Sequence, residues 1–64
     1  MKRKQKAIEI LARVNDGKFR DDADAEEAIN IAIENGNEFI TRGCSACRKP
    51  ALDYLRELIS IQNE

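Results

Sequence analysis

The residues with the most concentrated chemistry lie in one segment, residues 42–50, which reads Arg-Gly-Cys-Ser-Ala-Cys-Arg-Lys-Pro. This segment contains both cysteines of the chain, three basic side chains and the single proline. The Cys-x-x-Cys spacing brings the thiols of Cys44 and Cys47 close together across a turn. A helix that begins near Cys47 favours its thiolate through the helix dipole, and the cations of Arg48 and Lys49 add to that effect.

The cysteine pair admits three interpretations. Free cysteine is among the most buried residue types, so both residues fit as small packing groups beside a helix start. A redox-active dithiol is the second interpretation. The third is zinc, which in structural sites takes four thiolate or imidazole ligands. Because the chain has no histidine, zinc requires Cys44 and Cys47 from two chains, and it is the single cofactor that we consider. We favour packing, because one pair of cysteines is unspecific.

The same segment also predicts an anion-binding site. Backbone N–H groups at the N-terminus of a helix attract anions. The side chains that complete this site are Arg42, Ser45, Arg48 and Lys49. The expected ligand is a phosphate, a nucleotide or an acidic side chain of a partner. The alternative is a solvated basic patch, because lysine and arginine are normally exposed.

The string Cys-Ser-Ala-Cys-Arg-Lys at residues 44–49 resembles the redox turn of thioredoxins. This resemblance implies a reactive thiol pair ahead of a helix. It covers the turn and its helix alone, because the rest of the chain lacks the period-two alternation that strands require. We therefore do not place the chain in the thioredoxin family.

Residues 4–15 predict an amphipathic helix with a broad apolar face. That face is formed by Ala7, Ile8, Ile10, Leu11 and Val14. Gly17 ends the helix, because glycine readily takes the left-handed conformation of a C-terminal cap.

An acidic run then starts a second helix. Asp21, Asp22 and Asp24 are candidate N-caps, and Asp24 with Glu27 has the spacing of a capping box. We interpret this run as a helix start in preference to a metal site.

The second helix is predicted to span residues 23–42 and to end at Gly43. Phe39 and Ile40 stay in phase with its apolar face, and burying them outweighs the cost of about 1 kcal/mol for Gly36 inside a helix. The alternative is two shorter helices bent at Gly36.

Pro50 positions the third helix. In the first turn of a helix the N–H groups have no partner within the helix, so the N–H that proline lacks costs nothing there. This predicts a helix over residues 48–62. The core stripe of this helix is Ala51, Leu52, Leu55, Leu58 and Ile59. Tyr54 and Ile61 widen that stripe on one side.

The 64 residues predict one all-α domain over residues 1–64, a helix hairpin followed by a C-terminal helix. A chain of this length buries only about 60% of its unfolded surface, and we therefore expect a homodimer. The residues expected at its interface are Ile31, Tyr54, Leu58 and Ile61.

Composition and charge limit the classes of partner that the chain is expected to bind. A net charge of −1 argues against a dedicated nucleic-acid binder, and the basic start, residues 2–6, has no aromatic side chains for stacking on bases. No apolar run is long enough for a signal peptide or a membrane span. Two cysteines are too few for a secreted disulfide framework. We therefore expect a cytoplasmic protein with no membrane contact.

Two Ala/Ile-rich stretches carry a further resemblance. Lys-Ala-Ile-Glu-Ile-Leu at residues 6–11 and Glu-Ala-Ile-Asn-Ile-Ala-Ile-Glu at residues 27–34 are joined by an acidic loop. This half of the chain resembles small helical proteins of phages and prophages. The resemblance implies a mobile-element setting, with the host cytoplasm as the location, and it carries over no functional residues.

These features favour binding over catalysis. The chain has no histidine, no obvious carboxylate pair and no phosphate-loop glycine pattern, so we do not expect an enzyme. The expected function is that of a phage-type accessory protein that binds and inhibits a host protein, in counter-defence or regulation. The alternatives are a small-ligand or nucleotide-binding sponge at residues 42–49, and a structural dimer stapled by zinc through Cys44 and Cys47.

Overall fold

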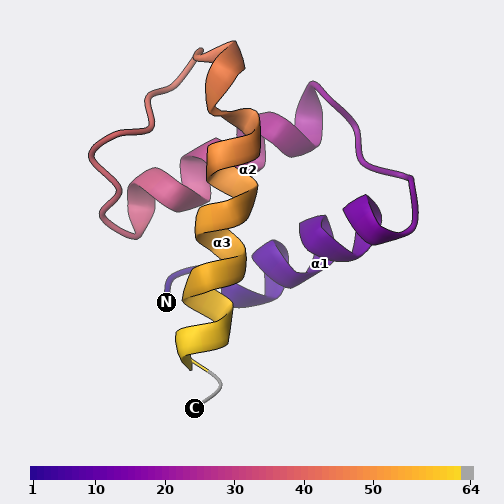
Figure 1. Cartoon of the computed structure of the whole chain (residues 1–64), viewed down its shortest axis with the longest axis horizontal. Helices are drawn as coiled ribbons and strands as arrows, with labels where there is room; N and C mark the ends of the chain where they lie inside the picture. The colour runs from indigo at the N-terminus through magenta and orange to yellow at the C-terminus, as the bar shows by residue number, and fades with distance from the viewer. Residues whose placement is uncertain (63–64) are drawn as a thin grey trace.

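The computed structural model describes residues 1–62, and every regular element in that range is helical. Its elements are α1 (Lys4–Asn15), α2 (Ala23–Glu34), the single-turn 3₁₀ helix η1 (Ser45–Cys47) and α3 (Arg48–Gln62). α1 and α2 run in opposite directions, and α3 crosses in front of α2 (Figure 1). This arrangement confirms the small all-α fold with a hairpin followed by a C-terminal helix.

The turn between α1 and α2 follows the sequence signals with one exception. Gly17 takes a φ of 72°, as predicted. Asp22 is the N-cap of α2, and its carboxylate accepts a hydrogen bond from the N–H of Ala23 at 2.6 Å. The prediction that Asp24 caps the helix is wrong, because its carboxylate is buried and bonded to Arg13 of α1.

The prediction of one long helix through Gly36 is also wrong. α2 ends at Glu34, and Gly36 takes a φ of 95°, which a helix does not accommodate. The N–H of Asn37 bonds back to the carbonyl of Ala32 at 3.1 Å. The Asn37 side chain then accepts from the N–H groups of Phe39 at 2.8 Å and Ile40 at 3.0 Å. Asparagine thus offers the backbone an alternative to the helix.

The two apolar residues after this break have opposite environments. Ile40 is 5% exposed and joins the core, whereas Phe39 is 93% exposed. The burial of Phe39 that we expected from the helical phase therefore does not occur.

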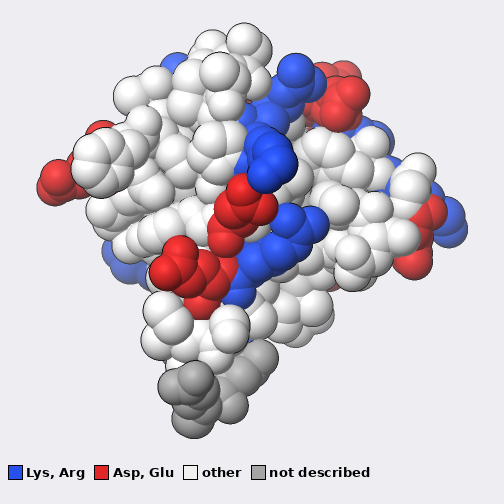
Figure 2. All heavy atoms as spheres, viewed as in Figure 1, with Lys and Arg blue, Asp and Glu red and all other residues white. Residues whose placement is uncertain are grey.

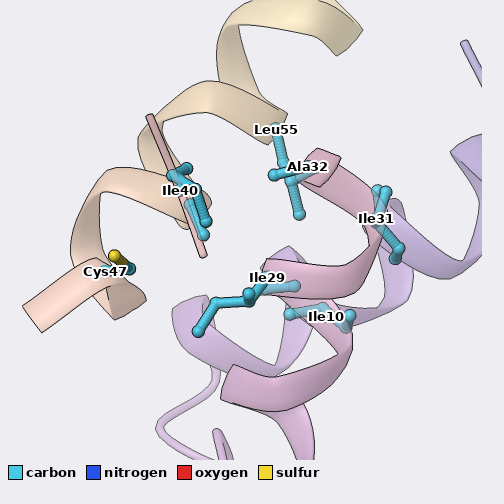
Figure 3. Packing of buried hydrophobic residues seen from close by; sticks show 10 residues of the cluster. Ile10, Ile29, Ile31, Ala32, Ile40, Cys47 and Leu55 are labelled. Atoms are coloured by element: carbon cyan, nitrogen blue, oxygen red, sulfur yellow. The ribbon is translucent and has the colours of Figure 1, made fainter. Parts of the chain in front are cut away.

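The core forms where the three helices meet, since each helix contacts the other two. The largest fully buried apolar side chains are Ile10, Ile31 and Leu55, one from each helix. In Figure 3, Ala32 of α2 lies next to Leu55, while Ile31 projects toward the side occupied by α1. Placing Ile31 at a dimer interface is therefore wrong. Two faces of α2 are covered within the chain, where the sequence pattern indicated one.

The basic start of the chain joins the hairpin at its open end. Asn35 exchanges hydrogen bonds with the backbone of Lys2, accepting from its N–H at 2.7 Å and donating to its carbonyl at 3.0 Å. Arg3 pairs with Glu27 at 2.5 Å and with Glu34 at 3.1 Å, and the first of these bonds is the main reason that its pKa is raised. Part of this basic segment therefore holds α1 to α2 and is not simply solvated.

The outward face of α3 is charged. Figure 2 shows basic and acidic side chains alternating down this helix. Asp53 contacts Lys49 at 3.0 Å and Arg56 at 3.2 Å. Within residues 1–62, no helix has both the length and the apolar character needed to cross a membrane.

Candidate functional site

A pocket of about 470 Å³ opens between the first half of α2 and the residues that lead into α3. Its volume falls in the range of about 300–1,000 Å³ that is usual for small-molecule sites. Its lining residues are Asp21, Asp22, Ala25, Glu26, Ile29, Asn30, Arg42, Gly43, Cys44, Ser45 and Arg48.

One wall carries two guanidinium groups. Arg48 spans the pocket, since its Nε donates to the Ser45 carbonyl at 3.2 Å and its Nη1 lies 3.9 Å from Oδ1 of Asp21. Arg42 is exposed and makes no ion pair with any residue in the range 1–62. Its five N–H donors are available to a ligand.

The opposite wall is acidic and the floor is apolar. Asp21, Asp22 and Glu26 come from the start of α2 and the residue or two before it, while the buried side chains of Ala25 and Ile29 form the floor. Three carboxylates against two guanidiniums give the lining a net negative charge. A ligand that carries only negative charge would be repelled by this wall, whereas a ligand of mixed charge meets a complement for each group.

The acidic wall is fixed in place by an ion pair beneath it. Asp24 accepts from Arg13 through Nε at 2.9 Å and Nη2 at 2.7 Å, and from the N–H of Arg20 at 3.0 Å. The hydrogen bonds from Arg13, followed by the one from Arg20, hold the pKa of the Asp24 carboxyl well below its usual value. This contact ties the first turn of α2 to α1, and so positions the neighbouring Asp22 and Glu26.

The structure brings three of the four predicted anion-site residues to one pocket. Arg42, Ser45 and Arg48 line it together. Lys49 does not, because its ammonium turns along α3 and bonds Asp53. Ligand binding by these residues stays a prediction.

The sequence pattern did not indicate the acidic half of the pocket. Asp21 and Asp22 are predicted only as candidate N-caps, and Glu26 has no predicted role. Their charge was visible in the sequence, but their position opposite Arg42 depends on how the connection between α2 and α3 folds back.

The two cysteines form a disulfide within the chain. Cys44 is half-buried and lines the pocket, whereas Cys47 is 8% exposed and belongs to the core cluster, as Figure 3 shows. Zinc binds thiolates, so a zinc-stapled dimer would apply only to the reduced protein. Among residues 1–62 no three His, Cys, Asp or Glu side chains are grouped to hold a metal ion.

The other expected interface residues have mixed environments. Ile61 is 57% exposed, and Leu58 is half-buried. The hydroxyl of Tyr54 donates to the Asn35 carbonyl at 3.2 Å, so this ring also has a role inside the chain. The homodimer stays a prediction that now rests on three residues.

Comparison with known proteins adds no assignment: no family model matches the chain, and neither curated proteins nor solved structures give a match. Function is therefore inferred from the pocket and the exposed residues around it.

Proposed function

We propose that this chain is a small binding protein whose pocket takes a ligand with both positive and negative charge. The observation that supports this most directly is the placement of Arg42 and Arg48 across the pocket from three carboxylates, above an apolar floor. A free amino acid or a short peptide has this distribution of charge.

The ligand would be held at both ends. Arg42 can take a carboxylate in a bidentate contact, because its guanidinium is exposed and has no intramolecular ion pair among residues 1–62. The hydroxyl of Ser45 adds a donor on the same wall. Asp21 and Glu26 would accept from an ammonium group, and an apolar part of the ligand would lie on Ile29.

This proposal restricts the class of ligand relative to the small-ligand or nucleotide-binding protein that the sequence predicts as an alternative. A nucleotide brings several negative charges to a lining whose own charge is negative. Charges of the same sign repel one another more strongly at a protein surface than in bulk water. Amino acids and short peptides are therefore favoured over nucleotides.

Isothermal calorimetry can test the proposal with free amino acids and dipeptides, and with ATP and inorganic phosphate as competitors. Arg42→Ala should weaken dipeptide binding about tenfold or more, the loss expected for one charge-assisted contact. Lys49→Ala is the matched control, because its ammonium bonds Asp53 outside the pocket lining. Glu26→Gln should weaken only ligands that have an amine. Tighter binding of ATP than of any dipeptide would contradict the proposal.

A second candidate is the expected accessory role, binding and inhibiting a host protein. The observation that favours it is Phe39, which is 93% exposed on the connection between α2 and α3. Aromatic side chains often contribute a large part of the binding free energy at protein interfaces. Capture of a defined host protein by the wild type, lost in Phe39→Ala and kept in Arg42→Ala, would support this role. Equal capture by wild type and Phe39→Ala would count against it.

A further inference from the structure

We infer that the Cys44–Cys47 disulfide exchanges with a small peptide thiol bound in the same pocket. The substrate class is a thiol that also carries carboxylate and ammonium groups. This inference rests on the proposed ligand pocket and adds a reaction to it.

The two sulfurs differ in their accessibility. Cys44 lines the pocket, while Cys47 is 8% exposed and is absent from the pocket lining. A thiolate in the pocket can therefore reach Cys44, and Cys47 is the natural leaving group. Buried on the core side with Ile40 and Ala51, the Cys47 sulfur is protected from direct attack.

The charges around Cys44 suit this chemistry. The attacking species in disulfide exchange is the thiolate, and nearby guanidinium groups favour it over the thiol. Arg42 and Arg48 lie on the wall that contains Cys44. The carboxylates across the pocket provide contacts for the ammonium group of a peptide thiol, so the same lining both orients and activates it.

The exchange proceeds in two displacements. The thiolate of the bound peptide attacks Sγ of Cys44, a new disulfide forms between them, and the electron pair of the broken bond leaves on Sγ of Cys47, which takes up a proton. A second peptide thiolate then attacks the peptide sulfur of this mixed disulfide and releases Cys44 as a thiolate. Two peptide thiols are oxidised to one disulfide, and the cysteine pair gains two electrons. The reverse sequence oxidises the protein.

Two probes of different charge test the inference on the wild-type protein. The rate at which the disulfide of the oxidised protein is reduced is measured with glutathione and with 2-mercaptoethanol. The same two rates are measured on a cyclic disulfide peptide of residues 42–50, and they correct for the intrinsic reactivity of each thiol. After that correction, glutathione should react with the protein about tenfold faster than 2-mercaptoethanol. A ratio equal to that of the peptide would overturn the inference.

Single-cysteine variants test which sulfur reacts. With glutathione disulfide, Cys47→Ala should acquire a mixed disulfide at Cys44 about tenfold faster than Cys44→Ala acquires one at Cys47, as measured by intact-protein mass spectrometry. Circular dichroism verifies folding, and the wild-type comparison decides the question if a variant does not fold. Equal rates in two folded variants would contradict the assignment of Cys44.

Calorimetry with S-methylglutathione separates this inference from the proposed function. This probe has the charges of the peptide thiol and cannot exchange. Binding of S-methylglutathione with no preferential exchange of glutathione would overturn the reaction and leave the pocket assignment intact. Absence of binding would overturn the pocket, and with it the oriented exchange.

Discussion

The hairpin of α1 and α2 and the connection between α2 and α3 use charged residues in opposite ways. In the hairpin, Arg3 and Arg13 are bonded to carboxylates of α2. In the connection, Arg42 has no ion pair within residues 1–62, and Phe39 is almost fully exposed. The first region uses its charges to hold helices together, and the second leaves Arg42 and Phe39 exposed to solvent. Stability and binding should therefore respond to different substitutions.

The largest expected effect is at the part-buried ion pair of Arg13 and Asp24 in the hairpin. Asp24→Asn leaves the guanidinium of Arg13 without its anionic partner, and breaking such a contact is strongly destabilising. We expect the midpoint of thermal unfolding to fall by about 10 °C or more, as measured by circular dichroism. Asp53→Asn is the control, because that carboxylate is exposed on α3 and its loss should change the midpoint by about 2 °C or less. Equal decreases of the unfolding midpoint in the two variants would contradict the prediction that Asp24 contributes more to stability than Asp53.

The same ion pair predicts how stability depends on pH. Arg13 and the Arg20 N–H lower the pKa of Asp24 in the folded protein, while in the unfolded chain it has the ordinary value of about 4. At acidic pH the unfolded chain therefore binds a proton at Asp24 more readily than the folded protein does. The ion pair contributes fully to the free energy of unfolding above the unfolded-state pKa, and this contribution is lost as the pH falls below that pKa. Urea unfolding between about pH 6 and pH 3 should show a shallower loss for Asp24→Asn than for the wild type. Parallel curves would contradict the prediction.

Reduction of the disulfide should have an intermediate effect. The cross-link joins residues only three positions apart, and the chain-entropy relation gives about 2 kcal/mol for a loop this short. Chemical unfolding with and without a reductant measures the difference. A variant with both cysteines changed to alanine should be insensitive to the reductant. A similar response in that variant would mean that the reductant acts elsewhere.

The smallest expected effect is at the exposed aromatic residue. Phe39→Ser removes a side chain that is 93% exposed, so the free energy of unfolding should change by no more than about 0.5 kcal/mol. The same thermal and urea experiments measure it. A loss as large as that of Asp24→Asn would show that Phe39 is packed in solution, and the contrast between the two regions would fail.

Much of the fold could be predicted from the sequence, because it depends on local signals. The apolar period and Gly17 located α1, and Pro50 with its following stripe located α3 at Arg48–Gln62. The end of α2 was missed, because Asn37 supplies side-chain acceptors that compete with helix continuation. The apolar period predicts that Phe39 is buried in a continuous helix, and it contains no information about hydrogen bonds from the Asn37 side chain to the backbone.

The site was half predictable for a related reason. Arg42, Ser45 and Arg48 are close in sequence, so their proximity follows from one turn. The acidic wall lies about twenty positions earlier in the chain, and only tertiary packing brings it opposite Arg42. Ile31 shows the same limitation, because its burial requires α2 to be covered on two sides.

The position of α3 across α2 also affects the order in which this fold can form during synthesis. α3 packs mainly against α2, and its buried residues Ala51 and Leu55 belong to the core that all three helices share. The ribosome makes α1 and α2 first, so the alanine-rich face of the nascent hairpin stays open to water until α3 emerges. We therefore expect a late, single folding event after most of the chain has left the exit tunnel, with chaperones having access to α2 until then.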